Sequence, residues 1–290
     1  MFYERAKAKI NLTLKVLGKR LDGYHELESF VAFADIADRL TYAPEEPYGI
    51  SVNGSYGTAI VGENLIHKAA LAFRDQVLDV RLGAFNLEKN LPIASGIGGG
   101  SANAAAALRL LCQAHNISTR EHPSIYAIAQ KIGADVPVCL NQTPAFMTGI
   151  GERLHVISEM PLLHCILVNP NCAVPTSEVF RRLNAEVLKP EVHAKKNRPN
   201  LEFKNHEDIL VYMRKNDNDL EQASISYQPI IADVLSALKN QTQSQIARMS
   251  GSGATCFAVY ASEAHAKEAT NIIELNYPEW WCVQTVLGNA

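Results

Sequence analysis

One stretch of the sequence decides the fold: Leu91-Pro92-Ile93-Ala94-Ser95-Gly96-Ile97-Gly98-Gly99-Gly100-Ser101-Ala102. An Ala- and Leu-rich run follows it at residues 103–111, and this composition predicts a helix. Glycine can take positive φ and lets a ligand come close to the backbone, while a helix N-terminus presents unpaired N–H groups and a partial positive charge. The stretch therefore predicts an anion site, most often for phosphate. The alternative is a tight strand-to-helix turn that binds nothing.

The well-known phosphate-binding motifs do not match this loop. No Gly-Lys-Ser or Gly-Lys-Thr follows the glycines, which excludes a Walker A loop. Gly96 and Gly98 are followed by Ser101 where the dinucleotide-binding fingerprint needs a third glycine. The sequence also lacks the His-Arg-Asp and Asp-Phe-Gly signatures of protein kinases. We therefore expect a phosphate loop of another kind.

The bulk properties of the chain limit its partners. It has 290 residues, of which 47% are hydrophobic and 20% charged, as in globular proteins of one large or two ordinary domains. A net charge of −3 and a pI near 6.3 argue against a nucleic acid or an anionic membrane held by bulk electrostatics. We expect no nucleic-acid partner and no membrane partner, and any phosphate chemistry must be local.

The cysteines and the first residues bear on the cellular compartment. Six cysteines are scattered without Cys-x-x-Cys pairs, and most lie in apolar runs, which predicts buried reduced thiols. The first seven residues contain no apolar leader segment, and no stretch reaches the ~18 apolar residues of a membrane span. These observations predict a cytoplasmic protein. The cysteines are Cys112, Cys139, Cys165, Cys172, Cys256 and Cys282.

The N-terminal stretch alternates apolar and polar side chains. Over residues 8–16 the period is two, which predicts a half-buried strand with Lys9 and Asn11 on its polar face. That face points to solvent, as is common for a strand lysine, or into a site. Asp22-Gly23 then predicts a turn, and Tyr24-His25 opens the next apolar stretch. An aromatic ring beside a histidine can stack on a base and contact its edge, or it can simply pack at a strand end.

The segments around the Gly-rich loop predict the order strand, loop, helix. An amphipathic helix is expected over residues 63–73, and a strand over residues 85–90 leads to the loop. A further helix is expected over residues 124–132. Pro137 suits the first turn of another helix, which would put Asp135 at its positive end. There Asp135 is either a helix cap or a catalyst.

The second half of the chain predicts a small α+β unit. A Gly turn between two short strands is expected at residues 145–154, and we place the domain change near residue 155. A buried strand and a helix capped by Thr176 or Ser177 follow, and residues 191–205 read as a loop. Ser250-Gly251-Ser252-Gly253 runs into a strand, so it lacks the advantage of a helix dipole and could be a simple hairpin. The expected strands are 165–170 and 282–287, and the expected helices are 177–183, 232–238 and 263–275.

Three motifs in this order resemble the GHMP small-molecule kinase superfamily over the whole chain. They are Lys9-Ile10-Asn11-Leu12 with Asp22-Gly23-Tyr24-His25, then Pro92 with Gly98-Gly99-Gly100-Ser101, and finally Ser250-Gly251-Ser252-Gly253. The resemblance implies an α+β, two-domain fold: a ribosomal-S5-domain-2-like N-terminal half over residues 1–155 and a ferredoxin-like α/β C-terminal half over residues 156–290. It also implies phosphoryl transfer from ATP with Mg²⁺.

Within this superfamily, residues 8–27, 133–137 and 218–221 resemble kinases that act on a cytidine diphosphate derivative. The resemblance implies phosphorylation of the 2-hydroxyl of 4-diphosphocytidyl-2-C-methyl-D-erythritol on the non-mevalonate route to isoprenoid precursors, by a monomer or homodimer. Metal ligands are not implied.

The resemblance also implies roles for single residues. Lys9 and Asp135 would be the catalytic pair, and residues Pro92 to Ala102 would bind the triphosphate of ATP. Tyr24 and Phe180 would stack on the cytosine and His25 would contact its edge, with Asn11 in the same substrate pocket. Phe180 is supported only by the pattern Val174-x-Thr176-x-x-x-Phe180.

The Gly-rich loop departs from the pattern of the superfamily at two positions. Ile97 replaces the usual Leu, and Ala102 replaces the final Ser. Ala102 removes one hydroxyl that could contact phosphate or metal, but the backbone N–H groups and Ser101 remain. ATP binding is therefore still expected.

Two other functions compete with this interpretation. Another kinase of the superfamily would act on homoserine, mevalonate or a sugar, but the Tyr24-His25 pair argues against it because those substrates carry no base to stack on. A non-catalytic binding protein, for RNA for example, would share the fold without the chemistry. The acidic pI and the joint presence of Lys9, Asp135 and two Gly loops argue against that alternative.

Overall fold

The computed structural model describes residues 1–59, 64–76, 80–119, 122–188 and 202–288. These residues form two compact units that alternate along the chain. The first unit contains Met1–Lys9, Ile36–Ile93 and Gly98–Gln142, and the second contains Ile10–Asp35, Ala94–Ile97 and Thr143–Ala290. The Gly-rich loop thus contributes residues to both units. The domain boundary near residue 155 stays a prediction.

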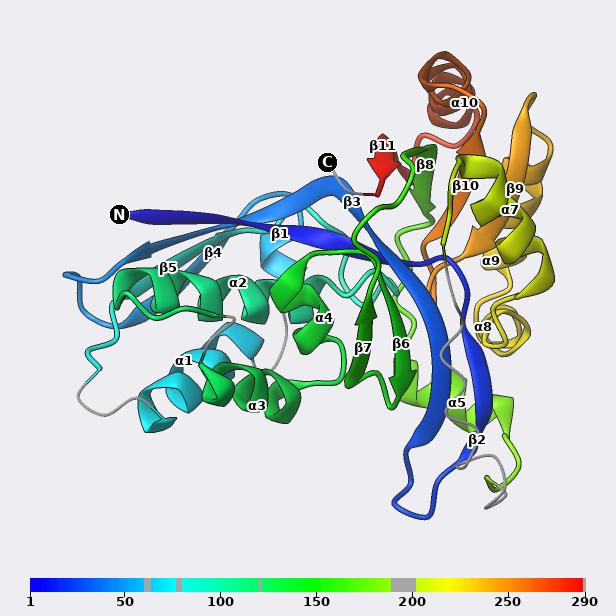
Figure 1. Ribbon diagram of the computed structural model, residues 1–290. Helices are drawn as coiled ribbons and strands as arrows, with labels where there is room; N and C mark the ends of the chain where they lie inside the picture. The colour runs from blue at the N-terminus through cyan, green and yellow to red at the C-terminus, as the bar shows by residue number, and fades with distance from the viewer. Residues whose placement is uncertain (60–63, 77–79, 120–121, 189–201, 289–290) are drawn as a thin grey trace. The chain divides into compact units, whose positions relative to one another are not determined.

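The first unit combines strands with four helices that pack on one another. Strand β5 (Ala84–Glu88) pairs antiparallel with the C-terminal half of β3 (His25–Ala43) and parallel with β4 (Gly49–Asn53). Strand β1 (Phe2–Asn11) also pairs with β3. Helix α2 contacts α1, α3 and α4, and Figure 1 shows α1, α2 and α3 gathered together beside these strands. The helices are α1 (Leu65–Gln76), α2 (Gly99–Ala114), α3 (Pro123–Ile132) and α4 (Val136–Asn141), with a short 3-10 turn, η1, at Gly57–Ala59.

Alternation along β3 and β5 builds the apolar face under these helices. Leu40 and Tyr42 of β3 lie opposite Leu87 and Phe85 of β5, and all four side chains are buried. The rings of Tyr42 and Phe85 stack with centroids 4.5 Å apart. Cross-strand pairs of this kind stabilise a sheet through direct side-chain packing. They place the end of β5, and with it the start of the Gly-rich loop, on a rigid support.

The second unit is built on an antiparallel sheet in the order β3-β11-β8-β10-β9. Strand β8 (Leu163–Asn169) lies between β11 (Trp281–Leu287) and β10 (Cys256–Tyr260), and β9 (Ser244–Met249) pairs with β10. The N-terminal part of β3 pairs with β2 (Lys15–Lys19) and β6 (Ala145–Gly149), and β6 pairs with β7 (Arg153–Val156). The two expected strands around a Gly turn are therefore confirmed.

Helices cover the core of the second unit. Helix α9 packs on β9 and β10, and α10 packs on β8, β10 and β11. Their apolar stripes bury residues such as Val234 and Ile273 against Val168 and Ala258 of the sheet. The helices are α5 (Thr176–Leu183), α7 (His206–Lys215), α8 (Glu221–Tyr227), α9 (Ile230–Lys239) and α10 (Glu263–Asn276).

The single strand expected over residues 8–16 is in fact two strands. β1 ends at Asn11 and β2 begins at Lys15. The N–H groups of Leu12 and Thr13 both donate to the carbonyl of Phe30, at 2.8 and 3.4 Å, which is the irregular two-to-one pairing of a bulge. Leu14 then leaves β3 and donates to the carbonyl of Asp217 at 3.1 Å. Pairing with a segment two hundred residues away is not encoded in local periodicity.

One further local expectation differs from the structure, and another is largely untested. Helix α5 has Pro175 at its N-cap position, without a side-chain cap, so neither Thr176 nor Ser177 caps it. Residues 189–201 lie outside the described residues, so most of the expected 191–205 loop is untested. Among the described residues, no helix is long and apolar enough to cross a membrane.

Candidate active site

The centre of the candidate site is an ion pair in the first unit. Nζ of Lys9 on β1 donates to Oδ2 of Asp135 at 2.9 Å. The Lys9 side chain is 4% exposed and that of Asp135 is 34% exposed, so the ammonium is enclosed while the carboxylate reaches solvent. The interpretation of Lys9 as an outward, solvated strand lysine is therefore wrong. Ile10 and Asn11, its neighbours on β1, are buried as well, so this end of the strand is covered on both faces.

Asp135 occupies the N-cap position of α4, as expected from Pro137 in the first turn. Its carboxylate makes no side-chain cap hydrogen bond, and it pairs with Lys9 instead. The helix N-terminus still favours the negative charge through its dipole. Asp135 therefore has the backbone position of a helix cap, while its carboxylate contacts Lys9 instead of the helix N–H groups.

Gly98 is the loop residue that lies against this pair. It is the N-cap of α2, with φ +66, in the left-handed region that glycine reaches at little cost. A Cβ at this position would lie 3.2 Å from Cε of Lys9 and 3.9 Å from Oδ2 of Asp135. Any larger residue would push against the Lys9 side chain. Because Gly98 has no side chain, the loop can lie directly against the ion pair.

The N-terminus of α2 supplies the donors that a phosphate needs. The first intrahelical bond runs from the Ala102 N–H to the Gly98 carbonyl at 2.8 Å. The N–H groups of Gly99, Gly100 and Ser101 precede it, and no side chain caps the helix. Ala102 itself is buried, so the methyl group packs inside the unit. The cradle therefore fits a polyphosphate held by backbone donors, as expected for ATP.

Arg109, further along α2, anchors the opposite end of α4. Its guanidinium donates to the carbonyls of Cys139 at 2.8 Å and Leu140 at 3.4 Å, and to the carboxylate of Glu4 at 2.9 Å. A cation at the last carbonyls of a helix also complements its dipole. Helix α2 therefore carries the phosphate cradle at its N-terminus and holds the helix that presents Asp135. Sequence reasoning missed Arg109 because nothing in its local pattern sets it apart from a surface arginine.

In the second unit, the ring of His25 stacks on Phe180 of α5, with centroids 4.6 Å apart and planes inclined by 27°. Burial, helped by the nearby charge of Lys19, lowers the pKa of His25, so the imidazole is neutral at neutral pH. Tyr24 is 58% exposed. The structure thus brings His25 and Phe180 together, while the stacking of Tyr24 and Phe180 on a base stays a prediction.

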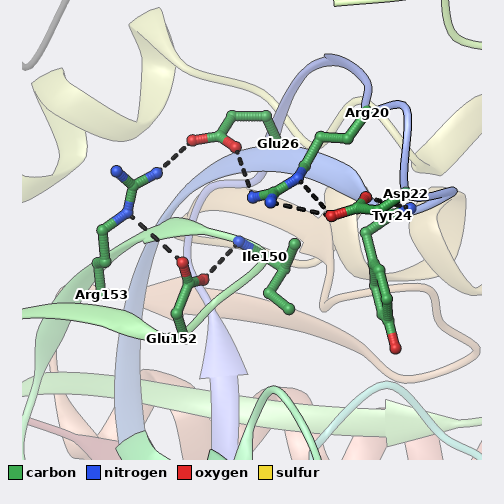
Figure 2. A network of polar contacts seen from close by, with 7 residues as sticks. All are labelled: Arg20, Asp22, Tyr24, Glu26, Ile150, Glu152 and Arg153. Atoms are coloured by element: carbon green, nitrogen blue, oxygen red, sulfur yellow. Dashed lines mark hydrogen bonds and ion pairs between the residues drawn. The ribbon is translucent and has the colours of Figure 1, made fainter. Parts of the chain in front are cut away.

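A polar network holds the hairpin that carries Tyr24 (Figure 2). Glu26 forms ion pairs with Arg20 and Arg153, and only 9% of its side chain is exposed. Oδ1 of Asp22 accepts the Tyr24 N–H at 3.1 Å, which fixes the turn. In Figure 2 the phenol ring of Tyr24 points away from the charged groups. The network therefore fixes the backbone on either side of His25 and leaves the Tyr24 ring free for a ligand.

Glu152 extends this network to the turn between β6 and β7. Its carboxylate accepts the Ile150 N–H at 2.6 Å and lies 3.6 Å from the guanidinium of Arg153. The sequence offers little signal for the pair of Glu26 and Arg153, because the two residues are 127 positions apart.

Asn11 and the second Gly/Ser loop meet in the second unit. The Asn11 N–H donates to Oγ of Ser250 at 3.1 Å, and its side-chain amide donates to Oγ of Ser29 at 2.8 Å. Oγ of Ser250 donates in turn to the carbonyl of Gly96 at 3.0 Å. Residues 250–253 therefore support the Gly-rich loop instead of forming an isolated hairpin. The role of Asn11 in substrate binding stays a prediction.

Asn218 holds the backbone of the second Gly/Ser loop. Its amide donates to the carbonyls of Met249 and Gly251, both at 2.8 Å, and the residue is buried. A further backbone hydrogen bond, from the Thr255 N–H to the Ser95 carbonyl at 3.1 Å, connects the residue before β10 to residues 94–97 of the Gly-rich loop.

The described residues contain no group of three or more His, Cys, Asp or Glu side chains placed to hold a metal ion. Thr176, one of the hydroxyls that could contact a metal, is hydrogen-bonded to Ser252 at 2.9 Å. Mg²⁺ commonly takes only one or two protein carboxylates and completes its shell with phosphates and water. The single carboxylate of Asp135 beside the phosphate cradle fits that pattern.

The family models and the sequence relatives agree on one family. The model described as "GHMP kinases N terminal domain" matches residues 64–149, and "GHMP kinases C terminal" matches residues 198–279. The chain belongs to the GHMP kinase family. This confirms the family predicted from the motifs and the α+β fold, and kinases of this family use ATP.

The relatives narrow the resemblance further. The 4-diphosphocytidyl-2-C-methyl-D-erythritol kinase of Bradyrhizobium sp. strain BTAi1 is 45% identical over 288 residues, covering 96% of this chain and 94% of the relative. The kinase of the same name from Bradyrhizobium diazoefficiens is 44% identical, covering 96% and 95%. A crystal structure of 4-(cytidine 5'-diphospho)-2C-methyl-D-erythritol kinase has a TM-score of 0.76 at 30% identity and covers all of both chains. The mevalonate kinase of Methanococcus jannaschii, at 15% identity and TM-score 0.69 over 99% of this chain and 98% of its own, shares the fold.

Proposed function

We propose that this kinase transfers the terminal phosphoryl group of ATP to the 2-hydroxyl of 4-diphosphocytidyl-2-C-methyl-D-erythritol, giving the 2-phosphate and ADP. The observation that carries the chemistry is the Lys9–Asp135 ion pair against Gly98, beside the N-terminus of α2. The names of relatives at 42–45% identity support the choice of acceptor. The reaction belongs to the non-mevalonate route to isoprenoid precursors and takes place in the cytoplasm.

Lys9 and the loop act on the phosphoryl group. Phosphoryl transfer asks the protein mainly for alignment and for charge stabilisation. ATP brings the phosphoryl group, and Mg²⁺ offsets the charge of its phosphates. The N–H groups at the start of α2 hold those phosphates, and the enclosed ammonium of Lys9 stabilises the charge that grows on the transferred group. Because Lys9 is 4% exposed on its side chain, water screens this charge weakly.

Asp135 acts on the acceptor. Its carboxylate is the more exposed partner of the pair, so it is free to accept a hydrogen bond from the substrate hydroxyl. It orients that hydroxyl and takes its proton as the new O–P bond forms. Lys9 holds the carboxylate in place through the 2.9 Å bond. Asp135 therefore both positions the substrate hydroxyl and accepts its proton.

The cytidine diphosphate end is recognised in the second unit. Tyr24 and Phe180 stack on the cytosine, the neutral His25 contacts its edge, and Asn11 lies in the same pocket. The support for this assignment is the exposed Tyr24 ring and the His25–Phe180 stack. We further propose two family domains that meet near residue 155, and a monomer or homodimer in solution.

The test is an ATP-to-ADP assay with Mg²⁺ on 4-diphosphocytidyl-2-C-methyl-D-erythritol, run beside methylerythritol phosphate, mevalonate and homoserine. We expect turnover on the cytidyl substrate alone. Asp135→Asn keeps an acceptor for Lys9 and should lower kcat by about a hundredfold or more, with an unchanged Tm. Turnover on mevalonate or homoserine would reject the proposed acceptor, and a near-normal kcat for Asp135→Asn would reject the role of Asp135.

Tyr24→Ala tests the base site separately. Loss of one stacking ring should raise KM for the cytidyl substrate by about tenfold and leave KM for ATP unchanged. A KM equal to that of the wild type would mean that Tyr24 plays no part in binding the base.

A further inference from the structure

A second ion pair lies directly before the Gly-rich loop, in the first unit. Asp38 of β3 pairs with Nζ of Lys89, the residue after β5. The side chains are 0% and 4% exposed, so this pair is more deeply buried than Lys9 and Asp135. Burying two charges costs more than an apolar pair of the same size would, so such a pair is weak evidence for stability alone. Its contacts indicate another purpose.

Asp38 holds the backbone that enters the loop. One carboxylate oxygen, Oδ2, accepts a hydrogen bond from the ammonium of Lys89. The other, Oδ1, accepts the N–H groups of Asn90 at 2.7 Å and Leu91 at 2.8 Å. The next residue is Pro92, which has no N–H to offer. Asp38 therefore binds the last two donors of the chain before the loop begins.

Lys89 connects the same point to the start of α2. A Cβ on Gly99, the first residue of α2, would lie 3.2 Å from Nζ of Lys89. The ammonium of Lys89 therefore lies against the first residue of α2. The backbone of Lys89 is also held, since its N–H donates to the Asn53 carbonyl at 2.8 Å and its carbonyl accepts the Tyr56 N–H at 3.0 Å.

An ammonium at this place has an electrostatic cost. The helix N-terminus is itself positive, so Lys89 and the dipole repel each other unless negative charge is near. Asp38 provides that charge in the described residues. Burial lowers the pKa of Lys89 in spite of this pairing. A bound polyphosphate at the first turn would add further negative charge to that of Asp38.

We propose that Asp38 and Lys89 are positioning residues for the nucleotide loop. Asp38 fixes the position of the backbone after β5. Lys89 keeps that backbone at a set distance from the first turn of α2, so that the N–H groups of residues 99–101 stay aligned for phosphate. This role rests on the proposed function of the loop as the ATP site. It differs from the role of Lys9 and Asp135, because Asp38 and Lys89 act on the backbone before the loop and on the first residue of α2.

The main test is the double variant Asp38→Ala/Lys89→Met. It removes both charges together, so no uncompensated ion is left inside, and the Met side chain fills most of the space of the Lys stem. The N–H groups of Asn90 and Leu91 lose their acceptor in this variant. We expect KM for ATP to rise about tenfold, with KM for the acceptor within twofold of wild type.

Two further variants provide the comparison. Asp38→Asn/Lys89→Met keeps an oxygen acceptor for the two N–H groups and leaves no buried charge, so KM for ATP should rise less than in the main variant, by no more than about threefold. Tyr42→Phe is a matched control in the same unit, because the hydroxyl of the buried Tyr42 accepts the Gly83 N–H at 3.0 Å, at the opposite end of β5. It should lower Tm and leave KM for ATP unchanged.

Direct binding separates this inference from the proposed function. ATP affinity is measured by calorimetry on the wild type and on each variant, without an acceptor. If the wild type binds ATP but does not phosphorylate the cytidyl substrate, the acceptor is wrong and the positioning role is still tested. A folded Asp38→Ala/Lys89→Met variant that binds ATP as tightly as wild type, or a loss of affinity no larger than that of Tyr42→Phe at equal Tm, would overturn the positioning role.

Discussion

At the scale of single residues, the site depends on where side chains are missing as much as on where they are present. Gly98 lets the loop lie against Lys9 and Asp135, and Gly99 leaves room for the ammonium of Lys89. Lys9 is useful because it is enclosed and paired at the same time. An identical lysine on an open strand would be screened by water and would stabilise a developing charge far less.

Gly98→Ala tests the close approach at the loop. The left-handed φ costs an alanine about 1–2 kcal/mol, and the new Cβ would press on Lys9 at 3.2 Å. We expect kcat to fall by at least about tenfold. Gly23→Ala is the matched control, since Gly23 has φ +88 and nothing within 4 Å of its Cβ position. Equal loss of kcat in both variants would attribute the effect to backbone strain alone.

The proposed contact of His25 with the base predicts a pH dependence of KM for the cytidyl substrate. Its pKa is lowered from 6.5, chiefly by burial, so protonation needs a pH below that value. We expect KM for the cytidyl substrate to be flat from about pH 8 to pH 6.5 and to rise as pH falls further, because the imidazolium has lost its acceptor nitrogen. The measurement is KM against pH for wild type and His25→Gln. A rise of the same size in His25→Gln would assign it to another group.

At the scale of elements, the short helix α4 carries Asp135 at its start, and the longer helix α2 holds α4 in place. Helix α4 has only six residues, and it keeps Asp135 in place because Arg109 of α2 binds its last carbonyls. The hairpin of β2 and β3 is held in the same way by Glu26 between Arg20 and Arg153 (Figure 2). In both cases a charged side chain closes a contact between segments far apart in the chain.

Arg109→Leu tests the anchor of α4. Without the guanidinium, the carbonyls of Cys139 and Leu140 lose their donor, and Asp135 is held less firmly. We expect kcat to fall by about tenfold with little change in either KM. The control is Arg39→Leu, because Arg39 has a side chain that is 63% exposed in the same unit. An unchanged kcat in a folded Arg109→Leu protein would show that α4 needs no such anchor.

At the scale of the whole molecule, the described part of the chain is held together by packing, without a disulfide bond. All six cysteines are unpaired; Cys172 and Cys282 are half-buried and the other four are buried. Burial raises the pKa of the thiols, to about 12 for Cys112, Cys139 and Cys282. The expected burial of the thiols is therefore confirmed for four of the six.

The thiols should be inert in the folded protein. The nucleophile is the thiolate, and a pKa near 12 leaves almost none of it at neutral pH. We expect iodoacetamide at about pH 7.5 to label at most Cys172 and Cys282 in the native protein and all six after denaturation. Mass spectrometry of the labelled peptides measures this. Rapid labelling of Cys112 or Cys139 in a protein with native circular dichroism would contradict it.

Local sequence determined the elements nearest the site. A helix at the end of the Gly-rich loop, the end of α3 before Asp135, and a helix with Pro137 in its first turn were all predictable, because propensity, glycine conformation and proline geometry act within a few residues. The motifs also predicted the family, and the resemblance implied that Lys9 and Asp135 act together. The nineteen-residue strand β3 and the break between β1 and β2 were not predictable in this way.

The tertiary structure alone decided how the loop is supported. Asp38 with Lys89, Arg109 with α4, and Glu26 with Arg153 each join residues that are between 30 and 127 positions apart. Local periodicity carries no information on such pairs, because a buried charge becomes favourable only once folding supplies its partner. The sequence by itself therefore predicted which residues would do the chemistry, and only folding decided which residues hold them in place.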